Sequence, residues 1–204
     1  AAACAMQEAF LIHISTDYVF DGEKGSPYNE EDETNPISVY GSSKLEGEEK
    51  IKTVFDNYLI IRTSWLYSEY GHNFMRTILA LAKEKDKIEV ISDQYGSPTY
   101  ARDLANCIID IIVKSILNPR AYLPGIYHYT NQGSCSWNEF AQEIINIAGI
   151  TTCEVVPITT DQYPHKAQRP RNSVLDTTKV RSAFGIGIPN WKDSLRECLS
   201  SITR

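Results

Sequence analysis

Short apolar runs that contain β-branched residues alternate along this chain with longer stretches of helical periodicity. A short apolar run is typical of a strand buried on both faces of a parallel sheet, and the intervening helices provide the crossovers that parallel strands require. We therefore expect an α/β fold with a largely parallel sheet. Ser136, followed three residues later by Glu139, predicts a capped helix start. The expected strands cover residues 10–14, 58–61, 87–91, 125–129 and 154–156, and the expected helices cover residues 37–54, 73–83, 101–116 and 137–147, with two short helices at the end.

The composition excludes several functional classes. The 204 residues are 42% apolar and 23% charged, with a net charge of −6 and no long Lys/Arg block, so no nucleic-acid partner is expected. No apolar run reaches membrane-spanning length, so no membrane association is expected. The five cysteines are odd in number and no pair has CxxC spacing, which supports neither a disulfide framework nor a zinc site. These features favour a cytoplasmic protein with reduced thiols.

Tyr40 and Lys44 lie four residues apart at the start of the helix expected over residues 37–54. This spacing places both side chains on one face of the helix. An ammonium beside a phenol favours the phenolate, and a positioned phenol can protonate the alkoxide that forms when hydride reaches a carbonyl carbon. A Tyr and a Lys at this spacing are also common on ordinary helices, so the pair alone does not establish a catalytic site.

Thr16 and Asp17 follow the first expected strand and begin a long acidic loop over residues 16–36. Ligands of parallel α/β sheets bind beyond the carboxyl ends of the strands, so Thr16 is placed to hydrogen-bond a substrate oxygen. A loop of this length in a compact domain is usually functional. The alternative is that Thr16 and Asp17 only cap the turn.

Five separated motifs occur in order along the chain. They are HISTDYVFDG at residues 13–22, YGSSKLEGE at 40–48, RTSWLY at 62–67, DQYGSPT at 93–99 and RPRNS at 169–173. Together they resemble the extended short-chain dehydrogenase/reductase superfamily and, within it, the dTDP-4-dehydrorhamnose reductase family. The resemblance covers essentially all of the chain. It implies NAD(P)H-dependent reduction of the C4 keto group of dTDP-4-dehydro-6-deoxy-L-mannose (dTDP-4-dehydrorhamnose) to dTDP-L-rhamnose, a precursor of cell-wall polysaccharide.

The resemblance implies roles for five residues. Thr16, Tyr40 and Lys44 match the family's Ser/Thr-Tyr-Lys triad. Tyr40 would donate the proton, and Lys44 would hold the nicotinamide ribose and favour the Tyr40 phenolate, so that both residues would contact the cofactor. Thr16 would tune the hydrogen bonds of the substrate carbonyl, and Thr16 and Asp17 would contact the sugar. Trp65 matches a tryptophan that lies against the deoxysugar ring, although a core aromatic is the alternative.

The resemblance also implies a partial Rossmann-type, doubly wound parallel sheet with a smaller C-terminal substrate-binding lobe. Residues 1–65 would form the remaining part of the dinucleotide-binding domain, and residues 66–204 mainly the lobe, with some segments returning to the sheet. Family members begin with a strand, a Gly-rich turn and a helix that binds the pyrophosphate, whereas this sequence has no G-x-x-G-x-x-G motif. We therefore expect the N-terminal half of the Rossmann domain to be missing from this chain.

The partners follow from the same resemblance. The cofactor would be NADPH or NADH, and the residue that distinguishes them at the ribose 2′ position would lie in the missing half. The substrate would be a dTDP-sugar. The resemblance leaves open a homodimer with Mg²⁺ at its interface, and no residue is assigned to that ion.

Other polar groups are weaker candidates. The histidines His13, His72, His128 and His165 lack a ligand-spaced partner, and His13, within an apolar strand, is expected to be a satisfied core imidazole. The acidic run at residues 30–33 is expected to be a solvated loop rather than a cation site.

Two further segments bear on nucleotide binding. Arg169 and Arg171 flank Pro170 and are candidates for contact with a nucleotide diphosphate. The Gly-rich segment 185–190 contains a proline and follows no strand, so it is not interpreted as a nucleotide-binding fingerprint.

Two other functions stay open. The regulatory β-subunit of methionine adenosyltransferase is similar to this family, but Trp65 favours the reductases, because the regulatory relatives resemble Arg-x-Pro at this position. The second alternative is a nucleotide-sugar epimerase or dehydratase. Dehydratases usually have Asp-Glu after the threonine, whereas Asp17 and Tyr18 follow Thr16 here, which favours simple reduction.

Overall fold

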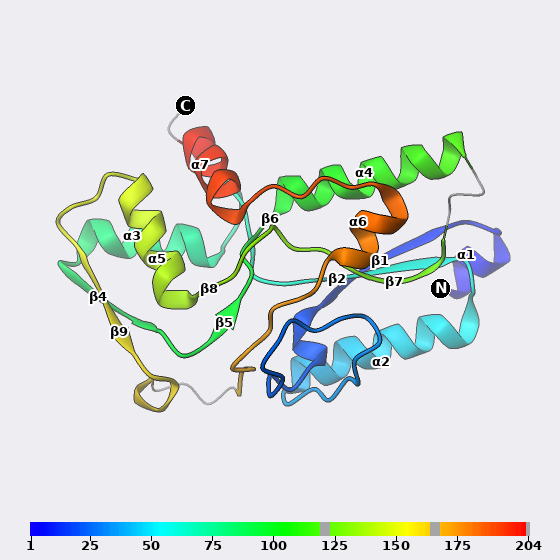
Figure 1. The fold of residues 1–204 in the computed structure, drawn as a ribbon, viewed down its shortest axis with the longest axis horizontal. Helices are drawn as coiled ribbons and strands as arrows, with labels where there is room; N and C mark the ends of the chain where they lie inside the picture. Colours follow the sequence, from blue (N-terminus) through cyan, green and yellow to red (C-terminus); the bar gives the residue numbers. More distant parts are fainter. Residues whose placement is uncertain (119–122, 164–167, 203–204) are drawn as a thin grey trace.

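The main sheet of the molecule has three parallel strands in the order β1-β2-β7 (Figure 1). The structure is a computed structural model that describes residues 1–118, 123–163 and 168–202. The strands are β1 (Leu11–Thr16), β2 (Tyr58–Thr63) and β7 (Gly125–His128). Because all three run in the same direction, their carboxyl ends share one edge of the sheet, the edge at which α/β folds bind ligands.

Helices cover both faces of this sheet (Figure 1). α2 (Val39–Val54) lies on one face, whereas α4 (Ala101–Leu117) and α6 (Thr178–Phe184) lie on the other. The short helix α1 (Ala2–Met6) precedes β1. Alternate strand residues form an apolar core with α4 and α6, which includes Leu59, Ile61, Leu104, Ile111, Tyr127, Val180 and Phe184.

A second group of elements forms the other end of the molecule (Figure 1). Here β4 (Lys87–Ile91) pairs in parallel with β9 (Glu154–Ile158). The helices of this group are α3 (Phe74–Glu84), α5 (Trp137–Ile147) and α7 (Trp191–Ile202). They pack on a large core that includes Met75, Ile78, Phe140, Ile144, Trp191 and Leu195.

Short pieces of secondary structure connect the two groups. β3 (Leu66–Tyr67) pairs in parallel with β6 (Thr99–Tyr100), and β5 (Tyr95–Gly96) pairs antiparallel with β8 (Cys135–Ser136). The 3-10 helices η1 (Asp17–Val19) and η3 (Thr160–Gln162) interrupt the two long loops. The sequence pattern did not predict the two-residue strands, because two residues cannot show a periodicity.

The expected α/β fold with parallel strands is confirmed, and each predicted helix and strand has a counterpart within a few residues. The capping box is also present: Ser136 Oγ accepts from the Glu139 amide at 3.1 Å, and Glu139 Oε2 accepts from the Ser136 amide at 2.6 Å. β1 extends two residues beyond the predicted strand, so that Ser15 and Thr16 belong to it.

The expectation for His13 was wrong, and the acidic run is only in part the solvated loop that was expected. His13 is not a satisfied imidazole, since its buried Nε2 has no hydrogen-bond partner among the described residues. The acidic run is not simply solvated: Glu30 Oε1 accepts from the His128 amide at 2.8 Å, and Asp32 pairs with Lys24 at 2.5 Å. The Glu30 contact ties the loop to the end of β7, and the Asp32 contact lies within the loop. His165 lies outside the described residues.

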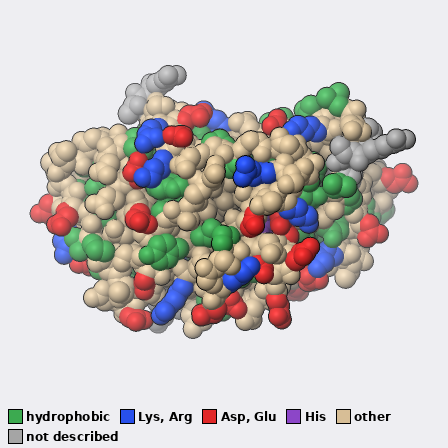
Figure 2. Space-filling model, viewed as in Figure 1, with side chains coloured by type: hydrophobic (Ala, Val, Ile, Leu, Met, Phe, Trp, Pro, Cys, Tyr) green, Lys and Arg blue, Asp and Glu red, His purple; other side chains and the backbone are tan. Residues whose placement is uncertain are grey.

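The surface mixes charges of both signs. Acidic and basic side chains are interspersed over the face shown in Figure 2, and hydrophobic side chains form separate patches between them. None of the helices in the described ranges has the length and apolar character needed to cross a bilayer.

Candidate active site

Thr16 ends β1 and caps the 3-10 turn that follows it. The Tyr18 amide donates to Thr16 Oγ1 at 3.2 Å, and the Thr16 hydroxyl donates to Asp17 Oδ1 at 3.0 Å. Both Thr16 and Asp17 are buried. The turn-capping geometry is therefore present, and it fixes the Thr16 hydroxyl at the carboxyl edge of the sheet.

The Asp17 carboxyl is only partly satisfied. Its Oδ2 is buried and has no hydrogen-bond partner among the described residues. Burial raises the pKa of Asp17 to about 7, against the opposing effect of hydrogen bonds from Ser173 and Thr16. Asp17 therefore changes charge near neutral pH, directly beside Thr16.

Tyr40 lies in the first turn of α2, where Ser38 Oγ caps the helix by accepting from the Gly41 amide at 3.1 Å. The Tyr40 side chain is 54% exposed. Its ring contacts the Tyr18 ring edge to face, with the centroids 6.0 Å apart. Tyr18 follows Thr16 by two residues, so this contact holds an accessible phenol next to the end of β1.

Lys44 is anchored to the same strand. Its Nζ donates to the backbone carbonyl of Ile14 at 2.6 Å, two residues before Thr16. An ammonium has three N–H donors, and this bond uses one of them. No hydrogen bond joins Thr16, Tyr40 and Lys44 to one another within the described chain; each is held separately on β1, η1 or α2.

A buried ion pair lies below these residues, between α2 and the sheet. Arg62 Nη2 lies 2.7 Å from Glu48 Oε2, and Arg62 Nε lies 3.0 Å from Glu48 Oε1. Ser15 Oγ also donates to Glu48 Oε1. The side chains of Glu48 and Arg62 are almost fully buried. Sequence reasoning missed this cluster, although Glu48 follows Lys44 by four residues on the same helix face.

Trp65 is held by aromatic stacking. Its ring lies 3.4 Å from the Trp137 ring, centroid to centroid, with the planes 7° apart. Its backbone has a φ of +47°, a conformation that is uncommon for residues other than glycine. A β-carbon at Gly96 would overlap the Trp65 indole, so the indole occupies the space beside that glycine. Trp65 is partly buried against the large core, and this leaves both expected roles open.

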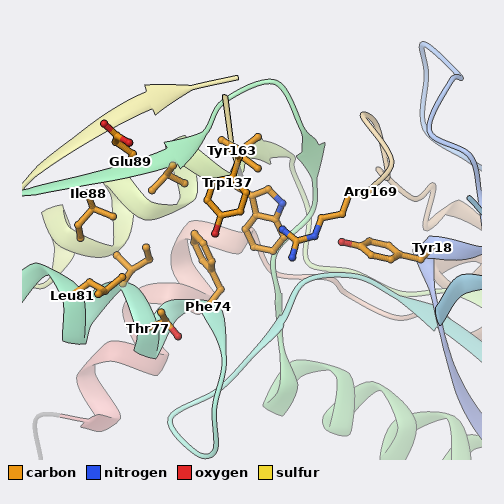
Figure 3. A pocket seen from close by; sticks show the side chains of 12 residues that line it. Tyr18, Phe74, Thr77, Leu81, Ile88, Glu89, Trp137, Tyr163 and Arg169 are labelled. Carbon is orange, nitrogen blue, oxygen red and sulfur yellow. The ribbon is translucent and has the colours of Figure 1, made fainter. Parts of the chain in front are cut away.

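A cavity of about 390 Å³ opens between α3 and β4 (Figure 3). Its apolar walls include Phe74, Leu81, Ile88 and Trp137, with Tyr163 nearby. Figure 3 shows Arg169 extending between Trp137 and Tyr18, whose hydroxyl points toward the Arg169 side chain.

The cavity therefore combines aromatic walls with one cationic group, that of Arg169. Tyr18 lines the cavity and also contacts the Tyr40 ring. Burial raises the pKa of Tyr18 to about 12, so its hydroxyl is a protonated hydrogen-bond donor at neutral pH. Of the two arginines weighed from the sequence, Arg169 lines the cavity and Arg171 does not belong to its lining.

Sequence reasoning missed the cavity walls because they come from separate segments. Phe74 lies on α3, Trp137 on α5, and Tyr163 follows η3. The one available signal was Trp137 itself, a large aromatic directly after a helix cap. Among the described residues, no group of three His, Cys, Asp or Glu side chains is arranged to hold a metal ion.

Comparison with known proteins gives a consistent result. A family model described as the RmlD substrate binding domain matches residues 1–204. A protein of Sinorhizobium fredii named dTDP-4-dehydrorhamnose reductase is 44% identical over 189 residues, which are 91% of this chain and 64% of that protein. A protein of Aggregatibacter actinomycetemcomitans with the same name is 44% identical over 201 residues, 96% of this chain and 68% of the relative.

A solved structure is also similar. The crystal structure of dTDP-4-dehydrorhamnose reductase from Bacillus anthracis, in complex with NADP, superposes with a TM-score of 0.91 at 39% identity and covers 98% of this chain and 68% of the other. The chain thus spans about two thirds of the length of the relatives that it matches.

Proposed function

The chain belongs to the RmlD substrate binding domain family, and from this we propose that the protein reduces the C4 keto group of dTDP-4-dehydrorhamnose to give dTDP-L-rhamnose. The observation that carries the proposal is the arrangement at the carboxyl end of β1. An accessible phenol, a cation and a strand-end hydroxyl are anchored there by separate contacts, next to a cavity with aromatic walls.

The chemistry assigned to this chain is proton transfer and positioning. The cofactor, when bound, supplies hydride to the carbonyl carbon. Tyr40 donates its phenolic proton to the oxygen that becomes an alkoxide. The Lys44 ammonium stabilises the phenolate that remains. Thr16 positions the substrate carbonyl oxygen by turning its single O–H from Asp17 Oδ1, its acceptor in this structure, toward the substrate.

The residues present fit the nicotinamide end of NADPH or NADH. Lys44 uses one of its three donors on Ile14, so two remain for ribose hydroxyls, and the Tyr40 phenol is exposed beside it. The B. anthracis relative was crystallised with NADP, which favours NADPH as the cofactor here. The choice between NADPH and NADH stays part of the proposal.

The cavity is proposed to hold the nucleotide part of a dTDP-sugar. Flat aromatic side chains such as Phe74 and Trp137 suit a pyrimidine ring, and Arg169 suits a diphosphate. To Trp65, which is stacked on Trp137, the proposal assigns contact with the deoxysugar ring next to the nucleotide.

The wider assignments stay proposals. Residues 1–65 would carry the catalytic part and residues 66–204 mainly the substrate-binding part, with β7 returning to the main sheet. A cytoplasmic location and a homodimer fit this function. The proposal assigns no residue to the Mg²⁺ ion that the resemblance left open.

Replacing Tyr40 by Phe in the natural full-length protein tests the proposal. Tyr40→Phe should remove most turnover of dTDP-4-dehydrorhamnose, followed by NADPH oxidation and by NMR of the product. Tyr70→Phe is the control, because Tyr70 is 77% exposed and does not line the cavity. Near-wild-type turnover in Tyr40→Phe would contradict the assigned role. Absence of sugar reduction by the wild type, together with co-purification with a methionine adenosyltransferase, would favour the regulatory alternative instead.

A further inference from the structure

We propose that Glu48 is a positioning residue, which through Arg62 and Ser15 fixes α2 on the sheet and so places Tyr40 and Lys44 relative to Thr16. This inference rests on the proposed function. It adds to that function a residue that lies below the site and touches neither substrate nor cofactor.

The partners of Glu48 are the immediate neighbours of the strand-end residues. Ser15 precedes Thr16 in β1, and Arg62 precedes Thr63 in β2. The parallel register sets Ser15 beside Arg62. One carboxylate on α2 therefore binds both strands one residue before they end.

Glu48 is also one helical turn beyond Lys44, so the two side chains leave the same face of α2. Lys44 reaches the Ile14 carbonyl, and Glu48 reaches Ser15 and Arg62. These contacts hold the sheet-facing side of α2 at two successive turns. A shift of the helix along its axis would break both sets of contacts together.

The hydrogen bonds of the pair are directional. Arg62 meets Glu48 through two nitrogens, and a two-pronged pair of this kind defines the relative orientation of its partners. Buried apolar side chains of similar volume often stabilise a fold as well as a buried ion pair does, but their contacts are not directional. The Arg62 Nη1 and the neighbouring His128 Nε2 have no partner among the described residues, so the cluster is not arranged for the greatest number of bonds. What distinguishes this cluster is that its directional bonds form at only one position of α2 on the sheet.

The direct test is Glu48→Gln in the natural full-length protein, which keeps the shape of the side chain and removes its charge. We expect kcat to fall about 10- to 100-fold, since a misplacement of about 1 Å by a residue remote from the chemistry can have an effect of this size. The KM for the dTDP-sugar should stay within about threefold, because neither Glu48 nor Arg62 lines the cavity, and the pH of half-maximal kcat should move. The control is Glu46→Gln on the same helix, whose exposed pair with Lys50 lies away from the sheet. Wild-type kcat and pH profile in Glu48→Gln would overturn the proposal.

A second variant separates positioning from stability, because removing one partner of a buried pair can unfold a protein. The double change Glu48→Met with Arg62→Met removes both charges together and should resist urea at least as well as Glu48→Gln. Positioning predicts that kcat stays low in this double variant. Recovery of wild-type kcat would show that the pair only stabilises the fold, and would overturn the proposal.

A readout that does not depend on sugar reduction keeps the two proposals apart. The Tyr40 ring packs against Tyr18, so the NMR resonances of labelled Tyr40 report the position of the start of α2. The chemical shifts of these Tyr40 resonances should change in Glu48→Gln and should stay unchanged in Glu46→Gln. Unmoved Tyr40 resonances would contradict the positioning role, whereas a wild-type protein that fails to reduce the sugar would contradict the proposed function alone.

Discussion

Gly41 of α2 lies directly against the backbone carbonyl of Tyr18, with no room for a side chain between them. A β-carbon at this position would overlap the Tyr18 oxygen and would lie 3.0 Å from Pro36 Cβ. The start of α2 and the turn after β1 are therefore in backbone contact, and Tyr40 is carried on the residue before that contact.

Gly41→Ala should accordingly disturb both stability and turnover. Backbone atoms cannot move aside as a flexible side chain can, so we expect the free energy of unfolding to fall by about 1–3 kcal/mol, and kcat to fall with it. Gly47→Ala on the same helix has no atom within 4 Å of the new β-carbon. It should instead gain about 0.5–1 kcal/mol from helix propensity. Urea unfolding of both variants tests these two expectations. Equal free energies of unfolding in Gly41→Ala and Gly47→Ala would contradict the close contact between Gly41 and Tyr18.

The raised pKa of Asp17 predicts a loss of stability as the pH rises. The folded protein holds the Asp17 proton up to pH about 7, whereas the unfolded chain releases it near 3.8. The stabilising effect of that proton is complete below the unfolded pKa and is lost as the pH rises through the folded pKa. Between pH 5 and 8 this group should lower the free energy of unfolding by about 2.5 kcal/mol. Asp17→Asn should not show this loss of stability between pH 5 and 8. The exposed control Asp161→Asn should show the same loss as the wild type. Urea titrations at both pH values check the two variants.

His128 should act in the opposite direction. Burial, assisted by the Arg62 cation, lowers the pKa of His128 to about 3, so the folded protein keeps this imidazole neutral. Its stabilising effect is complete above the unfolded pKa of 6.5 and is lost as the pH falls toward 3. Between pH 7.5 and 5 the loss should be about 2 kcal/mol. His128→Asn can keep the bond to the Tyr28 carbonyl, which His128 Nδ1 makes at 3.0 Å, without titrating. A variant as acid-sensitive as the wild type would contradict the assignment.

Gly96→Ala tests the role of Trp65 without removing the indole. The new β-carbon would displace Trp65 from its place beside Trp137. If Trp65 contacts the sugar, KM for the dTDP-sugar should rise about fivefold, the equivalent of about 1 kcal/mol of aromatic contact. Gly187→Ala, with nothing within 4 Å of its β-carbon, is the matched control. An unchanged KM in Gly96→Ala would assign Trp65 to the core.

The sequence predicted those features whose causes are local. The apolar run before Thr16 and the stripe of α4 each carry their own periodicity, and the cap at Ser136 depends on a residue three positions away. Thr16, Tyr40 and Lys44 were predicted as site residues for the same reason, since each lies in a short motif.

The features that were missed depend on register and on contacts distant in the sequence. Glu48 and Arg62 meet only because α2 packs on β2 after a turn that no periodicity describes. Trp137 and Phe74 share a cavity although they lie 63 residues apart along the chain. Glu30 accepts from the backbone amide of His128 at the end of β7, 98 residues away along the chain. A run of acidic residues alone could not reveal this partner.

The stack of Trp65 on Trp137 also gives the protein an intrinsic optical probe. Two indoles stacked at 3.4 Å, with nearly parallel planes, couple their electronic transitions and should produce a distinctive near-ultraviolet circular dichroism band. The chain has three tryptophans, and the third, Trp191, is buried against Phe140. Because Trp137 lines the cavity, a nucleotide that enters would perturb the coupled pair and leave Trp191 unchanged. Ligand binding could therefore be followed by spectroscopy on the unlabelled protein.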